Sequence, residues 1–153
     1  MNRIVLATVF LAISTVLSPA AAVAAPIGFT AFGGLYTDPV DEFMLGAGVK
    51  VGLGGFSITP SAEYIFVDSG TYYTLNADAT IPIVPLGVAS LYGGGGVGLH
   101  VFDPEEGDSD TETGINLLVG AGFNAIGLKP YGQIKYVFLE GDDPLVFMAG
   151  IRF

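Results

Sequence analysis

The feature that most constrains this chain is a regular alternation of apolar residues with small or polar residues, which recurs in eight segments. Successive side chains of a β-strand point to opposite faces, so each segment predicts a strand with one apolar face. Each segment reaches the ~9–11 residues that a tilted strand needs to cross the hydrocarbon of a membrane. The predicted strands are 27–36, 43–53, 56–67, 71–81, 88–102, 113–124, 128–139 and 145–153.

The connections between these segments fall into two alternating kinds. The second, fourth and sixth, at 54–55, 82–87 and 125–127, are short and uncharged, whereas the odd ones carry nearly all the acid. In outer-membrane barrels the long polar loops face outward and the tight turns face the periplasm. We therefore expect acidic loops outside the cell and both chain ends in the periplasm. The acids of the odd connections include Asp38, Asp41, Glu42, Asp68, Asp103, Glu105, Glu106, Asp108, Asp110, Glu140, Asp142 and Asp143.

One face of the predicted strands is apolar throughout and carries no charge in any strand core. Its aromatic residues gather near the strand ends, as in the two interfacial girdles of an outer-membrane barrel. Strand propensity alone would explain their presence but not this clustering. The predicted periplasmic girdle is Phe29, Phe56, Phe123 and Phe153, and the outer one is Phe43, Tyr64, Phe66, Tyr73, Tyr136, Phe138 and Phe147.

The opposite face is small or polar and includes four charged residues. A soluble barrel of the lipocalin or streptavidin type would need the apolar face inside, which would place these charges in an apolar cavity. We therefore expect this face to line the lumen. Glu63 and Lys135 are predicted to form an ion pair at mid-height, and Lys50 and Asp78 a second pair lower down, because an unpaired enclosed charge is costly. The bulky lumen residues are Lys50, Glu63, Asp78, Tyr92, Tyr131, Gln133, Lys135 and Arg152.

The composition agrees with a membrane barrel. Hydrophobic residues make up 51% of the chain and charged residues only 13%, about half the usual charged fraction of a soluble domain. Beyond the N-terminus no apolar run reaches the ~20 residues of a spanning helix, and a closed barrel is the other fold that satisfies its backbone in lipid. Cysteine is absent, so no disulfides support the fold, and the net charge of −10 argues against nucleic-acid partners.

The N-terminus has the pattern of a cleavable signal peptide. A positive region at Arg3 precedes an apolar run over residues 4–17, and small residues follow a break at Pro19. Cleavage is expected after Ala24, which gives a signal peptide over residues 1–24 and a barrel domain over residues 25–153. An uncleaved membrane anchor is the alternative.

The signal peptide, the eight strands and the terminal sequence 149–153 resemble the small OmpA/OmpX-type outer-membrane barrels. The resemblance implies an all-β, up-and-down antiparallel transmembrane barrel in a Gram-negative bacterium. It also implies that the barrel-assembly machinery reads Phe153 together with alternate apolar residues before it, although Met148 stands where that signal favours glycine. Those alternate residues are Ile151, Ala149, Phe147 and Leu145.

Two motifs suggest other chemistry. Gly93, Gly95 and Gly98 have the spacing of a dinucleotide-binding fingerprint, but that motif needs a following helix, so close packing in a narrow barrel explains them better. His100 is the single histidine. Some barrels of this size are lipid A-modifying enzymes, and Asp68-Ser69 or Asp108-Ser109 could complete a site with it. The serine two residues after the histidine, which the deacylase pattern requires, is missing, so we expect a lumen residue.

Three functions remain open: a sealed barrel that anchors acidic loops for surface interactions, a narrow channel for small solutes, and a lipid A-modifying enzyme. An eight-stranded barrel is just wide enough for side chains to fill it. The bulky lumen residues therefore favour closure, although the glycines of the fifth segment argue the other way. We predict a monomeric, non-enzymatic protein without catalytic, cofactor or metal-site residues. Its partners are outer-membrane lipid and lipopolysaccharide, with weak divalent-cation binding at residues 103–112.

Overall fold

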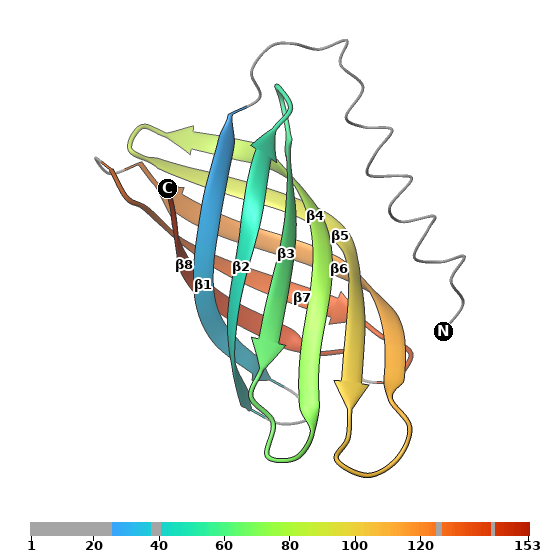
Figure 1. Cartoon of the computed structure of the whole chain (residues 1–153). Coiled ribbons are helices and arrows are strands. Elements are labelled where there is room, and N and C mark those ends of the chain that lie inside the picture. Colours follow the sequence, from blue (N-terminus) through green and yellow to red (C-terminus); the bar gives the residue numbers. More distant parts are fainter. Residues whose placement is uncertain (1–25, 38–40, 125–126, 142) are drawn as a thin grey trace.

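The protein is an all-β closed barrel of eight antiparallel strands in chain order (Figure 1), as the alternation predicted. The computed structural model describes residues 26–37, 41–124, 127–141 and 143–153. Pairing of the first strand with the last closes the barrel. The strands are β1 (Ile27–Thr37), β2 (Glu42–Gly52), β3 (Ser57–Ile65), β4 (Thr71–Leu86), β5 (Ala89–Asp103), β6 (Asp110–Phe123), β7 (Lys129–Phe138) and β8 (Leu145–Arg152).

The predicted signal peptide over residues 1–24, its cleavage site and the acids Asp38 and Asp142 lie outside the described residues. Across the described ranges, no helix is long and apolar enough to cross a membrane.

The two ends of the barrel differ in their connections. The connections after β1, β3, β5 and β7 share what we call the loop end, at the bottom of Figure 1. Those after β2, β4 and β6 share the turn end with the C-terminus, at the top. Gly54, Gly87 and Gly127, one in each of these three connections, have φ of 78°, 69° and 88°. Tight turns need such a left-handed residue, which glycine adopts without steric cost.

The largest departure from the predicted strands is at the fourth connection. Residues 82–87 were predicted as a turn, but β4 continues to Leu86 and pairs with β5 beyond a bulge between Pro82 and Val84. The β4–β5 hairpin therefore projects from the turn end (Figure 1). Pro82 misled the prediction because proline is normally excluded from central strands. The pairing of β4 with β3 stops at Thr80, opposite Ser57, so beyond Thr80 this edge of β4 is free and tolerates proline.

At the loop end β1, β2, β5 and β6 run further than predicted, so some acids lie in the sheet. The β5–β6 ladder reaches Phe102 and Asp110, and Asp103 pairs with Thr71. Glu42 pairs with Tyr36 on the other side of the barrel. The prediction that Asp110 is outside the ladder is therefore wrong. Acidic residues have low strand propensity, but antiparallel strands that project into water can carry them at their ends.

The two faces of the barrel are as the alternation predicted. Large apolar side chains cover the outside, including Ile115 at 61% exposure and Val97 at 55%. The predicted girdle residues are among them, apart from the partly buried Tyr136. The four predicted lumen charges point inward, and Lys135 and Glu63 are 0% and 2% exposed. The exposed girdle residues are Phe29, Phe56, Phe123, Phe153, Phe43, Tyr64, Phe66, Tyr73, Phe138 and Phe147.

Candidate functional site: the lumen and its two ends

An ion pair occupies the middle of the lumen. Lys135 Nζ lies 2.6 Å from Glu63 Oε1, and both side chains are almost fully buried. The second carboxylate oxygen of Glu63 accepts hydrogen bonds from the Tyr36 hydroxyl at 3.0 Å and the Thr74 hydroxyl at 2.9 Å. The predicted pair is confirmed, and the extra donors satisfy the carboxylate that burial deprives of water.

A chain of polar side chains continues from this pair toward Asp78. Asn76 donates to the Thr74 hydroxyl at 2.9 Å. Asn116 reaches across from β6 and donates to Asn76 at 3.0 Å and to Asp78 Oδ1 at 2.8 Å. All of these residues are buried. Together with the Glu63–Lys135 pair, these contacts form a connected polar network that joins β3, β4, β6 and β7 across the interior.

The predicted Lys50–Asp78 pair does not form. Glu63–Lys135 is the one ion pair within the part of the chain that the structure describes. The Lys50 ammonium lies 5.6 Å from the centre of the Tyr92 ring, while Asp78 is held by Asn116. Their positions along the strands predicted that Lys50 and Asp78 lie at the same height in the lumen. The sequence could not show that the side-chain amide of Asn116 on β6 would hydrogen-bond to the Asp78 carboxylate.

The glycines of β5 make room for this network. A Cβ at Gly96 would lie 2.3 Å from both Ala77 O and Asp78 Oδ1, and a Cβ at Gly98 would lie 2.6 Å from Asn76 Oδ1. Gly93 and Gly95 of the apparent fingerprint lie in the same strand and pair with β6, with no helix after them. The packing interpretation is confirmed for Gly98, whereas Gly93 and Gly95 lie on the outward parity of β5 with Val97.

Sequence reasoning missed an apolar layer at the loop end of the lumen. Five inward side chains near the strand ends are at most 4% exposed and belong to one apolar cluster. They occupy the inward positions that the prediction described as small or polar. The sequence did contain a signal for this layer, because each of these residues is an inward apolar residue within two positions of the strand boundary at the loop end. This apolar cap consists of Tyr36, Met44, Ile65, Val137 and Val146.

His100 is buried in the lumen between the network and the apolar cap. Its Nδ1 lies 3.0 Å from the Tyr72 hydroxyl. Ser109, the serine closest to it in sequence among those considered, donates instead to Asp103 at 2.8 Å on the exposed loop end. The structure therefore does not bring His100 together with the serine–acid pairs, and His100 is a lumen residue as expected.

The connections at the loop end, on the outer side of the apolar cap, are acidic and exposed. The side chains of Glu105, Glu106 and Asp108 are exposed. Asp143 accepts hydrogen bonds from the Leu139 amide and the Tyr136 hydroxyl, both at 3.2 Å. This carboxylate therefore stabilises the connection between β7 and β8. Across the described ranges, no three His, Cys, Asp or Glu side chains are placed to hold a metal ion.

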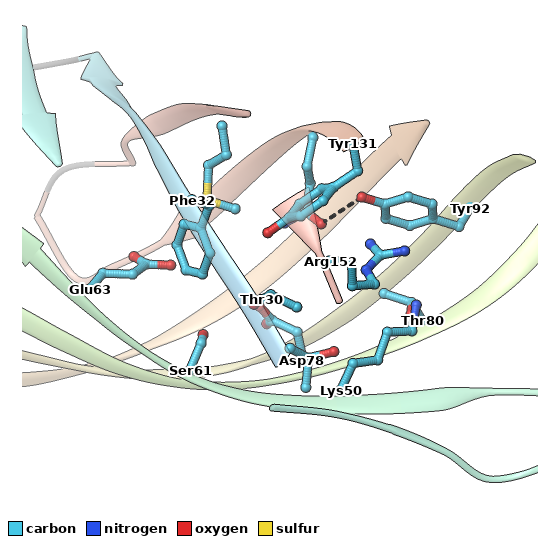
Figure 2. A pocket seen from close by; sticks show the side chains of 13 residues that line it. Thr30, Phe32, Lys50, Ser61, Glu63, Asp78, Thr80, Tyr92, Tyr131 and Arg152 are labelled. Atoms are coloured by element: carbon cyan, nitrogen blue, oxygen red, sulfur yellow. Dashed lines mark hydrogen bonds between the residues drawn. The ribbon is translucent and has the colours of Figure 1, made fainter. Parts of the chain in front are cut away.

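The turn end opens into a mouth of about 410 Å³. A smaller cavity of about 30 Å³ lies deeper, bordered by the Glu63 and Asp78 carboxylates (Figure 2). Lys50, Tyr92 and Arg152 line both spaces. The Arg152 guanidinium stacks 4.5 Å from the centre of the Tyr131 ring and 5.7 Å from that of Tyr92. These side chains form the floor of the mouth.

Comparison with known proteins supports the fold. No family model and no curated protein sequence matches the chain. The N-terminal β-barrel domain of Pseudomonas aeruginosa OprF is similar in structure, with a TM-score of 0.68 at 15% identity, covering 83% of this chain and 96% of that one. Neisserial surface protein A has a TM-score of 0.67 at 12% identity, covering 82% and 94%. Ail of Yersinia pestis, in complex with the heparin analogue sucrose octasulfate, has a TM-score of 0.55 at 18% identity, covering 83% and 97%.

These similarities define the class of fold. The chain has the closed eight-stranded architecture of the small bacterial outer-membrane barrels, as the resemblance in its sequence predicted.

Proposed function

We propose that the protein is an integral outer-membrane protein whose sealed barrel carries acidic loops at the cell surface for non-enzymatic interactions. The observation that carries this proposal is the lumen itself. The apolar cap, the Glu63–Lys135 ion pair and the Asn116 cross-link occupy successive levels of one narrow interior. Side chains at each of these levels obstruct the lumen, which supports assigning the function to the loops rather than to the lumen.

The outward face supports the membrane location. Exposed Ile, Leu, Val and Phe side chains cover the barrel wall between two aromatic girdles. Water would make this surface costly, whereas lipid hydrocarbon would not. Outer-membrane lipid and lipopolysaccharide are then the surroundings of a monomeric barrel, and Phe153 is the contact to the assembly machinery. The protein should fractionate with outer membranes and change its gel mobility on boiling; recovery as a soluble periplasmic monomer would refute the location.

The loops favour cationic partners. Asp103, Glu105, Glu106 and Asp108 are exposed, and no Lys or Arg lies in the odd connections of the sequence. A surface of one sign attracts the opposite sign and repels anionic lipopolysaccharide unless divalent cations bridge the two. The Ail structure contains a polysulfated heparin analogue, whereas the charge here favours cations such as Ca²⁺ or a basic protein surface.

A narrow channel is the second candidate. The observation that favours it is that the 410 Å³ mouth and the 30 Å³ cavity share lining residues and lie one behind the other. The cap still closes the far end. A lipid A-modifying activity has less support, because His100 bonds to Tyr72 rather than to a serine or a carboxylate.

Planar-bilayer recordings distinguish the first two functions. A sealed barrel predicts no steady conductance for the wild type. It predicts none for a variant that lacks residues 104–109 either, because the apolar cap lies inside the barrel and does not include that loop. A triple variant, Met44→Gly, Val137→Gly and Val146→Gly, should conduct measurably if it assembles. Large steady conductance of the wild type would support the channel instead.

A further inference from the structure

The cationic side chains of the barrel gather at one end. After Arg3 the sequence contains only Lys50, Lys129, Lys135 and Arg152 as Lys or Arg. Lys135 is neutralised by Glu63 in the lumen. The other three all line the mouth at the turn end, and no Asp or Glu is among the residues that line it. The mouth is thus a concave surface of positive charge.

These cations lack carboxylate partners. No Asp or Glu side chain in the part of the chain that the structure describes lies within ion-pair distance of Lys50, Lys129 or Arg152. Arg152 Nε is buried and has no hydrogen-bond partner. The rings of Tyr131 and Tyr92 lie 4.5 Å and 5.7 Å from the guanidinium and hold it by cation–π contacts, which do not supply an acceptor for Nε. A buried donor without an acceptor is costly, so an incoming acceptor would relieve it.

The C-terminal residue does not serve as that acceptor. Phe153 also lines the mouth, but its backbone oxygen accepts the Phe29 amide at 2.8 Å, and its own amide donates to Phe29 O at 3.0 Å. The residue is therefore held in register with β1, and no cation lies within ion-pair distance of it in the described ranges.

The mouth has the size and the neutral donors of a ligand site. Its volume of about 410 Å³ falls within the usual range for small-molecule pockets. Ser57, Thr80, Ser90 and Asn124 add hydroxyl and amide groups to its wall. Lys50, Tyr92 and Arg152 line both the mouth and the smaller cavity behind it (Figure 2).

We propose that this mouth binds the phosphate group of a small anion, either free phosphate or the headgroup of an anionic lipid. The planar guanidinium of Arg152 offers paired donors that match phosphate oxygens, and Lys50 and Lys129 add point charges. The inference goes beyond the proposed function, which assigns binding to the loop end. It also holds for either orientation of the barrel, so it does not depend on where the acidic loops face.

The test is amide chemical-shift mapping of the full barrel refolded in zwitterionic micelles. One arm adds sodium phosphate at constant ionic strength, with sodium chloride as the blank. The other adds dihexanoyl-phosphatidylglycerol. Saturable shifts at Gly28, Lys129 and Arg152, without shifts at residues 105–108, support the proposal, and the arm that saturates identifies the source of the phosphate. No saturable shift in either arm would overturn it.

Charge variants sharpen the test. Lys129→Gln with Arg152→Gln should weaken phosphate or lipid binding about tenfold or more, because each charge-assisted hydrogen bond contributes strongly in such a site. The matched control, Lys129→Arg with Arg152→Lys, keeps the charge and should retain most of the affinity. Equal binding by the neutral and the charged pair would overturn the proposal. If these variants do not fold, the chemical-shift titration of the wild type still tests the proposal.

Discussion

The loop end and the turn end of this barrel are lined by opposite chemistry. Next to the acidic loops, the side chains of the apolar cap, among them Met44 and Ile65, fill the lumen and are almost completely buried. At the turn end, Lys50 and Arg152 stack on tyrosine rings around a mouth of about 410 Å³. A narrow barrel can therefore be packed with apolar side chains at one end and open to a ligand at the other. The buried Glu63–Lys135 pair separates the two regions.

The largest expected effect comes from breaking the pair that separates the two ends. Lys135→Met leaves Glu63 as an uncompensated buried carboxylate and should lower the free energy of unfolding by about 3–5 kcal/mol. Denaturant unfolding in micelles measures this. The double variant with Glu63→Gln is the control and should recover much of the loss. A loss for Lys135→Met below about 1 kcal/mol would mean that the pair does not hold the lumen together.

The cap can be compared directly with the lipid-facing wall. Ile65→Ala removes a side chain that is 1% exposed and should cost about 2–5 kcal/mol through the cavity it leaves. Ile134→Ala makes the same chemical change on the outside, where Ile134 is 43% exposed and detergent fills the space. Its cost should be clearly smaller in the same unfolding measurement. Equal costs would show that the loop end is not tightly packed.

The glycines of β5 test how closely the lumen is filled. Gly96→Ala brings a Cβ within 2.3 Å of Ala77 O and Asp78 Oδ1 and should destabilise the barrel by about 1–3 kcal/mol. Gly55→Ala, in a turn where a Cβ meets nothing within 4 Å, is the matched control and should change stability by less than about 0.5 kcal/mol. Full tolerance of Gly96→Ala would indicate a looser lumen.

The smallest effect on stability is expected from the exposed acids. Glu105→Gln, Glu106→Gln and Asp108→Asn should change the free energy of unfolding by less than about 0.5 kcal/mol. Ca²⁺ affinity should fall in step with the charge removed, and it should fall for the wild type as salt rises, because ~0.1 M salt screens charges beyond about 10 Å. Calorimetric titration at low and high salt measures both. Identical Ca²⁺ binding by the two proteins at low salt would reduce the loops to a solubilising edge.

Much of this fold could be predicted because a strand reveals its two faces in sequence. The alternation assigned the outward girdles and the inward positions of Glu63 and Lys135, and a barrel with charges on one parity can close in only one sense. Side-chain contacts across the lumen were harder to predict from the sequence. Asn116 takes Asp78 from β6, and Lys50 turns to Tyr92 on β5. Strand tilt and side-chain reach decide those contacts, and neither is written in the local pattern.

The same reasoning explains the other errors. Pro82 is acceptable in β4 because the neighbouring strand β3 pairs no further than Ser57, opposite Thr80, which is a property of the assembled sheet. The apolar cap was overlooked because Met44, Ile65 and Val146 are apolar on the inward parity, where the overall pattern is polar. Inward apolar residues at strand ends are therefore a usable signal for lumen closure in chains of this kind.

Single-cysteine labelling tests the central claim, that a sealed barrel presents acidic loops outside the cell and a cationic mouth to the periplasm. The chain has no cysteine, so Asp108→Cys and Gly55→Cys report on the loop end and the turn end without background. In intact cells, a membrane-impermeant maleimide should label Asp108→Cys, and it should label Gly55→Cys only after the outer membrane is permeabilised. Labelling of Gly55→Cys in intact cells, with Asp108→Cys protected, would contradict the account.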